Sequence, residues 1–85
     1  MSYDYTNERK FVFTEVGIVT LLKIRDRVQK LLLASGAVRE QEIHSAMSGD
    51  SWQLLACVDY LVERGEIRRV HAEGVRQHNV YISNQ

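Results

Sequence analysis

The side chains best suited to chemistry in this chain are its single cysteine and its histidines. Cys57 stands alone, and the histidines are His44, His71 and His78. Zinc sites need paired ligands such as Cys-x-x-Cys, because closely spaced side chains must reach one tetrahedral ion. The spacing of these four residues matches no such pattern. We therefore expect no metal site and no cofactor.

The sequence also lacks the motifs of common catalytic sites. No nucleophile elbow, phosphate-binding glycine loop or paired acidic motif occurs in it. Cys57 lies between Ala56 and Val58 in an expected helix, where cysteine usually serves as a small buried hydrophobic residue. The chain is therefore expected to bind other molecules and not to be an enzyme.

Length and charge limit what it could bind. The 85 residues suffice for one domain, and 45% of them are apolar. Eleven basic and eleven acidic side chains give a net charge of zero. A protein that coats DNA without sequence preference is strongly basic, so any DNA binding here must come from a local patch of cations.

The sequence indicates a cytoplasmic protein with no membrane partner. With Cys57 as the only cysteine no internal disulfide can form, which fits a reducing cytosol. The N-terminus carries Asp4 and Glu8 and lacks the apolar core of a signal peptide. No apolar run approaches the roughly 20 residues that a membrane-spanning helix needs.

The first part of the chain predicts an arm followed by a long helix. Residues 1–13 form a polar arm that ends in Phe11-Val12-Phe13, which is either a short strand or a hydrophobic lead-in to the helix. The helix is expected over residues 16–34, with Thr14 as N-cap and Ser35-Gly36 as its end. Its apolar positions follow helical spacing and are Ile18, Leu21, Leu22, Val28, Leu31 and Leu32.

Two shorter helices and a hairpin complete the pattern. Helices are expected over residues 39–47, with Ile43 on the inner side, and over residues 50–64, with Asp50 as N-cap and Gly65 at the end. Strands over residues 68–72 and 75–82 then form a hairpin around residues 73–74, and a third short strand is possible at residues 37–38. The fold class is therefore α+β.

A set of residues along the second half of the chain forms a recognisable pattern: Val38, residues 41–47 and the turn 48–51, Val58 and Leu61, and Gly65-Glu66-Ile67 at the entry to the hairpin. On these residues the chain, over 18–82, resembles the winged helix-turn-helix superfamily, of the small prokaryotic regulator type. The resemblance implies a winged helix over residues 14–85, a three-helix bundle with a C-terminal two-stranded wing. It also implies that the helix over residues 50–64 enters the DNA major groove, while the 66–82 hairpin contacts the flanking backbone.

Carried onto this chain, the resemblance gives a set of DNA-binding residues. Those facing the groove would be Ser51, Trp52 and Leu55, near Ala56 and Asp59, and those on the wing would be Arg68, Arg69, Arg76, Gln77 and His78. The wing arginines could equally bind an acidic protein, or pair with Glu66 and Glu73 inside the hairpin.

The charge distribution favours a second hypothesis, a protein interface. Residues 39–63 carry one basic and five acidic side chains, which is the wrong sign for contact with phosphates. The 50–64 helix also has more apolar residues than one core face needs, so Trp52, Leu55 or Tyr60 could form an exposed interface. The alternative is that Phe11, Phe13 and the arm fold back and cover them.

Two functions therefore remain open. The first is a DNA-binding transcriptional regulator that binds double-stranded DNA. The alternative is a module that binds a protein partner. A homodimer is expected for either, because small regulators often bind two half-sites and a small core gains from added burial. The expected dimer surface is the 16–34 helix or the segment from Phe11 to Phe13.

Overall fold

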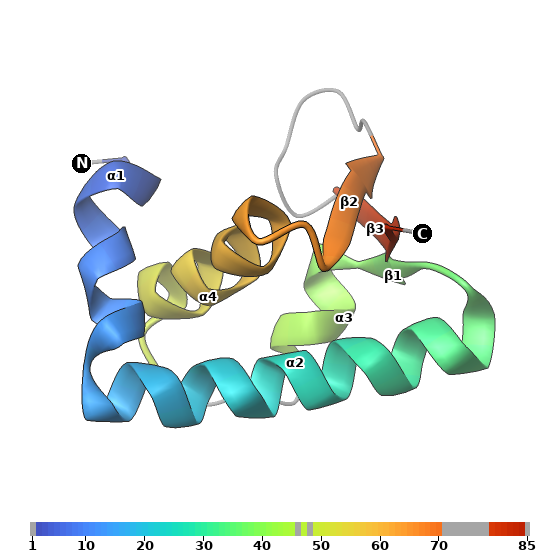
Figure 1. The fold of residues 1–85 in the computed structure, drawn as a ribbon, viewed down its shortest axis with the longest axis horizontal. Helices are drawn as coiled ribbons and strands as arrows, with labels where there is room; N and C mark the ends of the chain where they lie inside the picture. The colour runs from blue at the N-terminus through green and yellow to red at the C-terminus, as the bar shows by residue number, and fades with distance from the viewer. Residues whose placement is uncertain (1, 46, 48, 71–78, 85) are drawn as a thin grey trace.

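The computed structural model describes residues 2–45, 47, 49–70 and 79–84. Over these residues the chain is α+β, as the sequence predicts, with helices packed against a three-stranded antiparallel sheet (Figure 1). In chain order the elements are α1 (Tyr5–Glu8), the 3-10 helix η1 (Arg9–Phe13), α2 (Glu15–Ser35), β1 (Val38–Arg39), α3 (Glu40–His44), α4 (Ser51–Glu63), β2 (Ile67–Val70) and β3 (Val80–Ser83).

The long helix α2 has the predicted N-cap and terminating glycine, and it extends one residue beyond the expected 16–34 at each end. The Thr14 hydroxyl accepts a hydrogen bond from the Gly17 amide at 3.0 Å and caps the N-terminus. At the other end Gly36 has a φ of 77°, a left-handed conformation that favours glycine. No helix in the described part of the chain is long and apolar enough to span a membrane.

Helix α4 has the predicted ends as well. The Asp50 carboxylate accepts a hydrogen bond from the Trp52 amide at 2.8 Å and a longer one from Gln53. Gly65 follows the helix with a φ of 76° and directs the chain into β2. These two caps fix where α4 begins and ends.

Helix α3 is shorter than the expected 39–47. Arg39 is not helical because it pairs with Val80 in the sheet, so the helix begins one residue later. The helix ends at His44, where the Glu42 carbonyl accepts hydrogen bonds from the Arg27 guanidinium at 2.8 and 3.0 Å. Ile43 is fully buried, as its predicted inner position requires.

The sheet has the strand order β1-β3-β2. Strands β2 and β3 pair antiparallel, from Ile67 opposite Ser83 to Val70 opposite Val80, which confirms that the two predicted strands pair. Their bounds differ from the expected 68–72 and 75–82, because β2 begins one residue earlier, whereas β3 begins only after Asn79 and ends one residue later. The predicted third strand is also present, displaced by one residue, as β1 beside β3. The two strands of the predicted hairpin thus belong to a three-stranded sheet, and the turn predicted at residues 73–74 falls outside the described residues.

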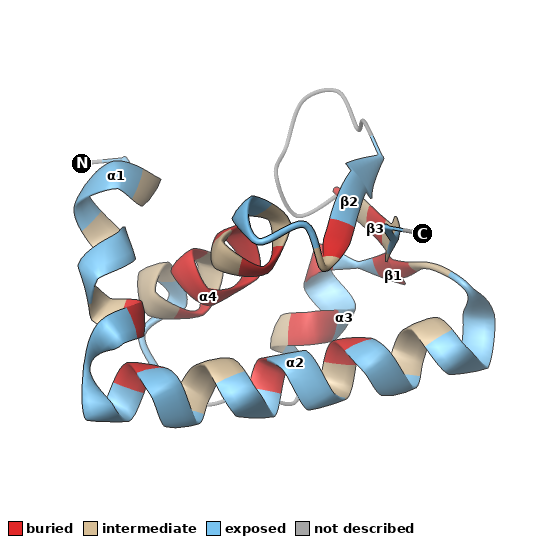
Figure 2. Cartoon of the chain, in the orientation of Figure 1, coloured by how far each residue is buried: buried red, intermediate tan, exposed pale blue. Residues whose placement is uncertain are grey.

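The core lies between α2, α4 and the inner face of the sheet (Figure 2). Its larger members are Val12, Ile24, Val28, Val38, Ile43, Leu54, Val58, Leu61, Ile67 and Tyr81. The prediction for α2 is partly wrong, because Ile24 is in this core while Ile18 and Leu22 are exposed. The first half of α2 is apolar on most of its circumference, so spacing alone does not select the buried side.

The N-terminal segment is folded, and Phe11-Val12-Phe13 is helical and not a strand. Val12 is buried in the core, while the Phe11 carbonyl accepts hydrogen bonds from the backbone and the hydroxyl of Thr14. These bonds make a sharp turn between η1 and α2. The turn presses the Phe11 carbonyl against α2 at Gly17, where an added Cβ would lie 1.8 Å from the oxygen.

We predict that Gly17→Ala destabilises the protein by on the order of 2 kcal/mol, because the turn must open to admit a methyl group. Chemical denaturation followed by circular dichroism measures the change. Gln29→Ala, an exposed substitution in the same helix, is the control and should have little effect. Equal stability of the two variants would show that the η1–α2 turn is not tightly packed.

Candidate functional site

The outward face of α4 is covered by the N-terminal segment, residues 3–13. Figure 1 shows α1 and η1 rising beside α4 from the start of α2. The Tyr3 hydroxyl donates to the Asp59 carboxylate at 2.7 Å, and the Tyr5 hydroxyl donates to Glu63 at 2.8 Å. The Arg9 guanidinium bonds both oxygens of Glu63, at 2.7 and 2.9 Å. Both carboxylates of this face are therefore satisfied within the chain.

Aromatic rings also contribute to the contact between the N-terminal segment and α4. The Phe13 ring meets the Tyr60 ring edge to face, with 5.4 Å between centroids and an angle of 84°. The Arg9 guanidinium lies 5.0 Å from the centre of the Phe13 ring and 5.9 Å from that of Tyr60. Such cation–π contacts add to the ion pair with Glu63, so Arg9 anchors the segment.

The contact shifts the pKa values of its members. Hydrogen bonds from Arg9 and then Tyr5 lower the pKa of Glu63 from 4.5 to about 2. Burial, followed by the hydrogen bond to Glu63, raises the pKa of Tyr5. The hydrogen bond to Glu63 raises the pKa of Arg9. The ion pair therefore stays formed across the neutral pH range.

The sheet holds α4 from the other side through Arg69. Its guanidinium bonds the Asp59 carboxylate at 2.6 Å and lies 5.5 Å from the centre of the Tyr81 ring. Asp59 thus accepts bonds from both the N-terminal segment and β2. Arg69, predicted to hold DNA, is engaged within the fold.

The predicted DNA-binding residues are not gathered on one open surface. Of the residues predicted to face the groove, Ser51 is exposed, whereas Trp52 and Leu55 are half-buried. Ala56 and Asp59, expected to face the groove, are buried because the helix is covered on that side. Arg68 is exposed. The remaining wing residues Arg76, Gln77 and His78 lie outside the described residues.

The predicted protein interface on α4 is closed as well. Trp52, Leu55 and Tyr60 are half-buried, and the arm folds back over the helix at Tyr60, where Phe13 and Arg9 contact its ring. Phe11 is also half-buried, while Phe13 keeps half of its surface exposed. Burial thus moves the candidate interface from α4 to the outer side of η1 and α2.

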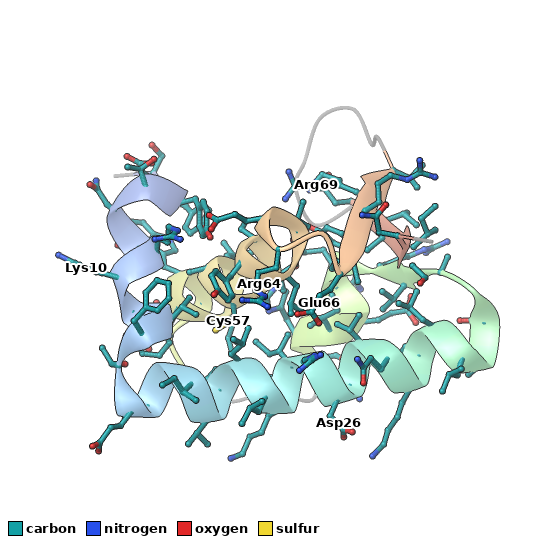
Figure 3. The ribbon with its side chains drawn as sticks, viewed as in Figure 1. Lys10, Asp26, Cys57, Arg64, Glu66 and Arg69 are labelled. Carbon is teal, nitrogen blue, oxygen red and sulfur yellow. The ribbon has the colours of Figure 1, made fainter. Side chains whose placement is uncertain are left out.

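Five large apolar side chains are exposed there, and we call them the α2 apolar face. It consists of Phe13, Val16, Ile18, Val19 and Leu22, which are 53%, 66%, 47%, 52% and 54% exposed. Glu15 and Lys23 flank the members of this face that lie on α2, and the charged Asp26 and Lys30 follow along the helix before the exposed Leu33. Asp26, which points away from the body of the molecule in Figure 3, pairs with Lys30 at 3.0 Å.

The sequence names the 16–34 helix or the Phe11–Phe13 segment as the expected dimer surface, but helical spacing alone does not show that Ile18 and Leu22 lie on the exposed side. A signal was present in the excess of apolar residues in the first half of α2. Ile18, Val19, Leu21, Leu22 and Ile24 surround more of the helix than one core face can use.

A second open surface is the outer face of the sheet. Arg68 alternates with the inward-facing Ile67 and Arg69, so it points outward, and the register places Arg39 on the same side. Within the described residues neither arginine forms an ion pair. Between them lie the outward-facing side chains Val70, Val80 and Ile82.

Two groups capable of chemistry are structural in this fold. Glu40 is 2% exposed and bonds His44 Nε2 and the Tyr81 hydroxyl, each at 2.8 Å, which ties α3 to β3. Nothing in the sequence pattern of the expected 39–47 helix indicates that Glu40 is buried. Cys57 is fully buried, and burial raises the pKa of its thiol to about 11, so the thiol stays neutral at pH 7.

No protein-family model, curated protein or solved structure matches this chain. Its function must therefore be inferred from the geometry of its own residues.

We predict that Arg9→Ala raises the pKa of Glu63 from about 2 toward 4.5, because the strongest bond to the carboxylate is lost. Carbon-13 NMR of the Glu63 carboxyl during an acid titration measures it. A lowered pKa stabilises the docked segment above pH 4.5, and this stabilisation disappears as pH falls toward 2. Lys10→Ala, beside Arg9 but outside the ion pair, should leave the titration unchanged. An unaltered midpoint in Arg9→Ala would contradict the anchoring role of Arg9.

Proposed function

We propose that this chain is a winged-helix module whose function is protein–protein interaction through the α2 apolar face. The order helix, short strand, two helices and two strands, from α2 to β3, supports the winged-helix assignment. The sheet order β1-β3-β2 is compatible with the family to which residues 18–82 are similar.

The observation that carries the proposal is the exposure of five neighbouring large apolar side chains. Val16, Val19 and Leu22 project from successive turns of α2, and Ile18 and Phe13 extend the surface beside them. Single exposed hydrophobic residues are common, but a contiguous patch on a small domain marks a binding surface. The apolar centre with charged ends also has the composition of a protein interface.

The chemistry of α4 supports a protein partner over DNA. Phosphates attract cations, yet the outward side of α4 presents Asp59 and Glu63. Entry of α4 into a groove would require the N-terminal segment to leave, which would break the ion pair of Arg9 with Glu63. Binding of a protein to the α2 apolar face requires no such departure of the N-terminal segment.

The test places a photoreactive amino acid at position 19 and, as control, at position 33 of the full chain in a cell extract. Leu33 is on the same helix and is 89% exposed, but it lies three turns beyond the α2 apolar face. We expect a protein adduct, with any partner including a second copy, at position 19 and not at position 33. Equal labelling at both positions would contradict the proposal.

DNA binding is a second candidate, favoured by the outer face of the sheet. Arg39 and Arg68 lie on this face without an ion pair among the described residues, so both are available to phosphates. Two phosphate contacts would give a weak, salt-sensitive affinity, with a slope of log K against log salt of about −1.8.

Fluorescence anisotropy of a labelled duplex at two salt concentrations tests this candidate. The double variant Arg39→Ala/Arg68→Ala should abolish binding and its salt dependence if the sheet face contacts DNA. Lys10→Ala/Lys30→Ala removes the same charge elsewhere and is the control. No binding by the unaltered protein at low salt would exclude this candidate.

A further inference from the structure

We infer that the occupant of the α2 apolar face is a second copy of this chain, with its α2 antiparallel to the first about a two-fold axis at Val19. This inference rests on the proposed function and names the partner of the same surface. It follows from the charges that border the face and from the way they repeat about its centre.

The charges are self-complementary. Glu15 lies four residues before Val19 and Lys23 lies four residues after it, so the three residues form one ridge along the helix. A two-fold axis at Val19 brings Glu15 of each copy opposite Lys23 of the other, at both ends of the contact. Within the described residues neither side chain has an ion pair in its own chain.

The apolar side chains fit the same arrangement. Ile18 and Leu22 form the neighbouring ridge, also four residues apart. The ridge of Val19 from one copy can lie in the groove between these two ridges of the other. Packing of such ridges is the commonest class of helix contact, with an angle of about −50° between axes 8–10 Å apart.

A crossed contact also agrees with where the apolar surface stops. After Lys23 the outward side of α2 carries Asp26 and Lys30, whose carboxylate and ammonium pair with each other and remain 65% and 75% exposed. A long antiparallel coiled coil would bury this pair, whereas helices crossing at Val19 diverge before reaching it. The zero net charge of the chain adds no general repulsion between copies.

The experiment is sedimentation equilibrium of the full chain over a range of concentrations, with charge-reversal variants. We expect a monomer–dimer equilibrium in the unaltered protein. Glu15→Lys alone and Lys23→Glu alone should each weaken the dimer roughly tenfold, because two attractive pairs become repulsive. The double variant Glu15→Lys/Lys23→Glu should regain most of the affinity, since the pairs are restored with their signs exchanged.

Val19→Asp tests the centre of the contact. Two carboxylates would meet at the axis, so this variant should be a monomer at every concentration, while Leu33→Asp should dimerise like the unaltered protein. Both positions are exposed in one copy, so both variants should fold, which circular dichroism verifies.

The outcomes distinguish the inference of a second copy from the proposed function in protein–protein interaction. A concentration-independent monomer overturns the second copy as occupant, and position 19 would then label a different protein if the proposed function holds. A monomer without any adduct at position 19 overturns both. A dimer in which the double charge reversal is as weak as the single variants overturns the antiparallel arrangement.

Discussion

The arrangement of this protein depends on how the two outward carboxylates of α4 are satisfied. Glu63 is held by Arg9 and Tyr5, and Asp59 by Tyr3 and Arg69. Without partners, these carboxylates would be costly to bury, so the face of α4 that carries them would stay in solvent. Because the N-terminal segment and the sheet supply the partners, they cover the helix from both sides, and α4 becomes an interior element.

Docking of the N-terminal segment in turn determines which surface stays open. The segment reaches α4 through a tight turn at Gly17, which also sets where α2 begins. The Phe13 ring therefore contacts Tyr60 while about half of the residue stays exposed to solvent. Within the described chain, no element covers the outer side of the first half of α2. A helix that would be read as core from its composition thus presents an apolar face outward.

Local signals in the sequence predicted much of the fold, since Thr14, Asp50, Gly36 and Gly65 act through their immediate neighbours. Long-range contacts were not predictable in this way. The bond of Arg69 to Asp59 spans 10 residues and that of Arg9 to Glu63 spans 54, and no periodicity encodes either. Composition revealed the excess of apolar residues correctly, but only the tertiary contacts show that α4 is covered while α2 is not.

The central claim is that the outer side of α2, and not α4, meets a second copy of this chain in solution. Relaxation of side-chain NMR signals by a neutral soluble paramagnet measures the accessibility of each methyl group directly. At high protein concentration we expect the methyl groups of Val19 and Leu22 to be shielded relative to Leu33, and to become accessible on dilution. The claim would be contradicted if the methyl groups of Val19 and Leu22 were as accessible to the paramagnet at high protein concentration as they are at low concentration.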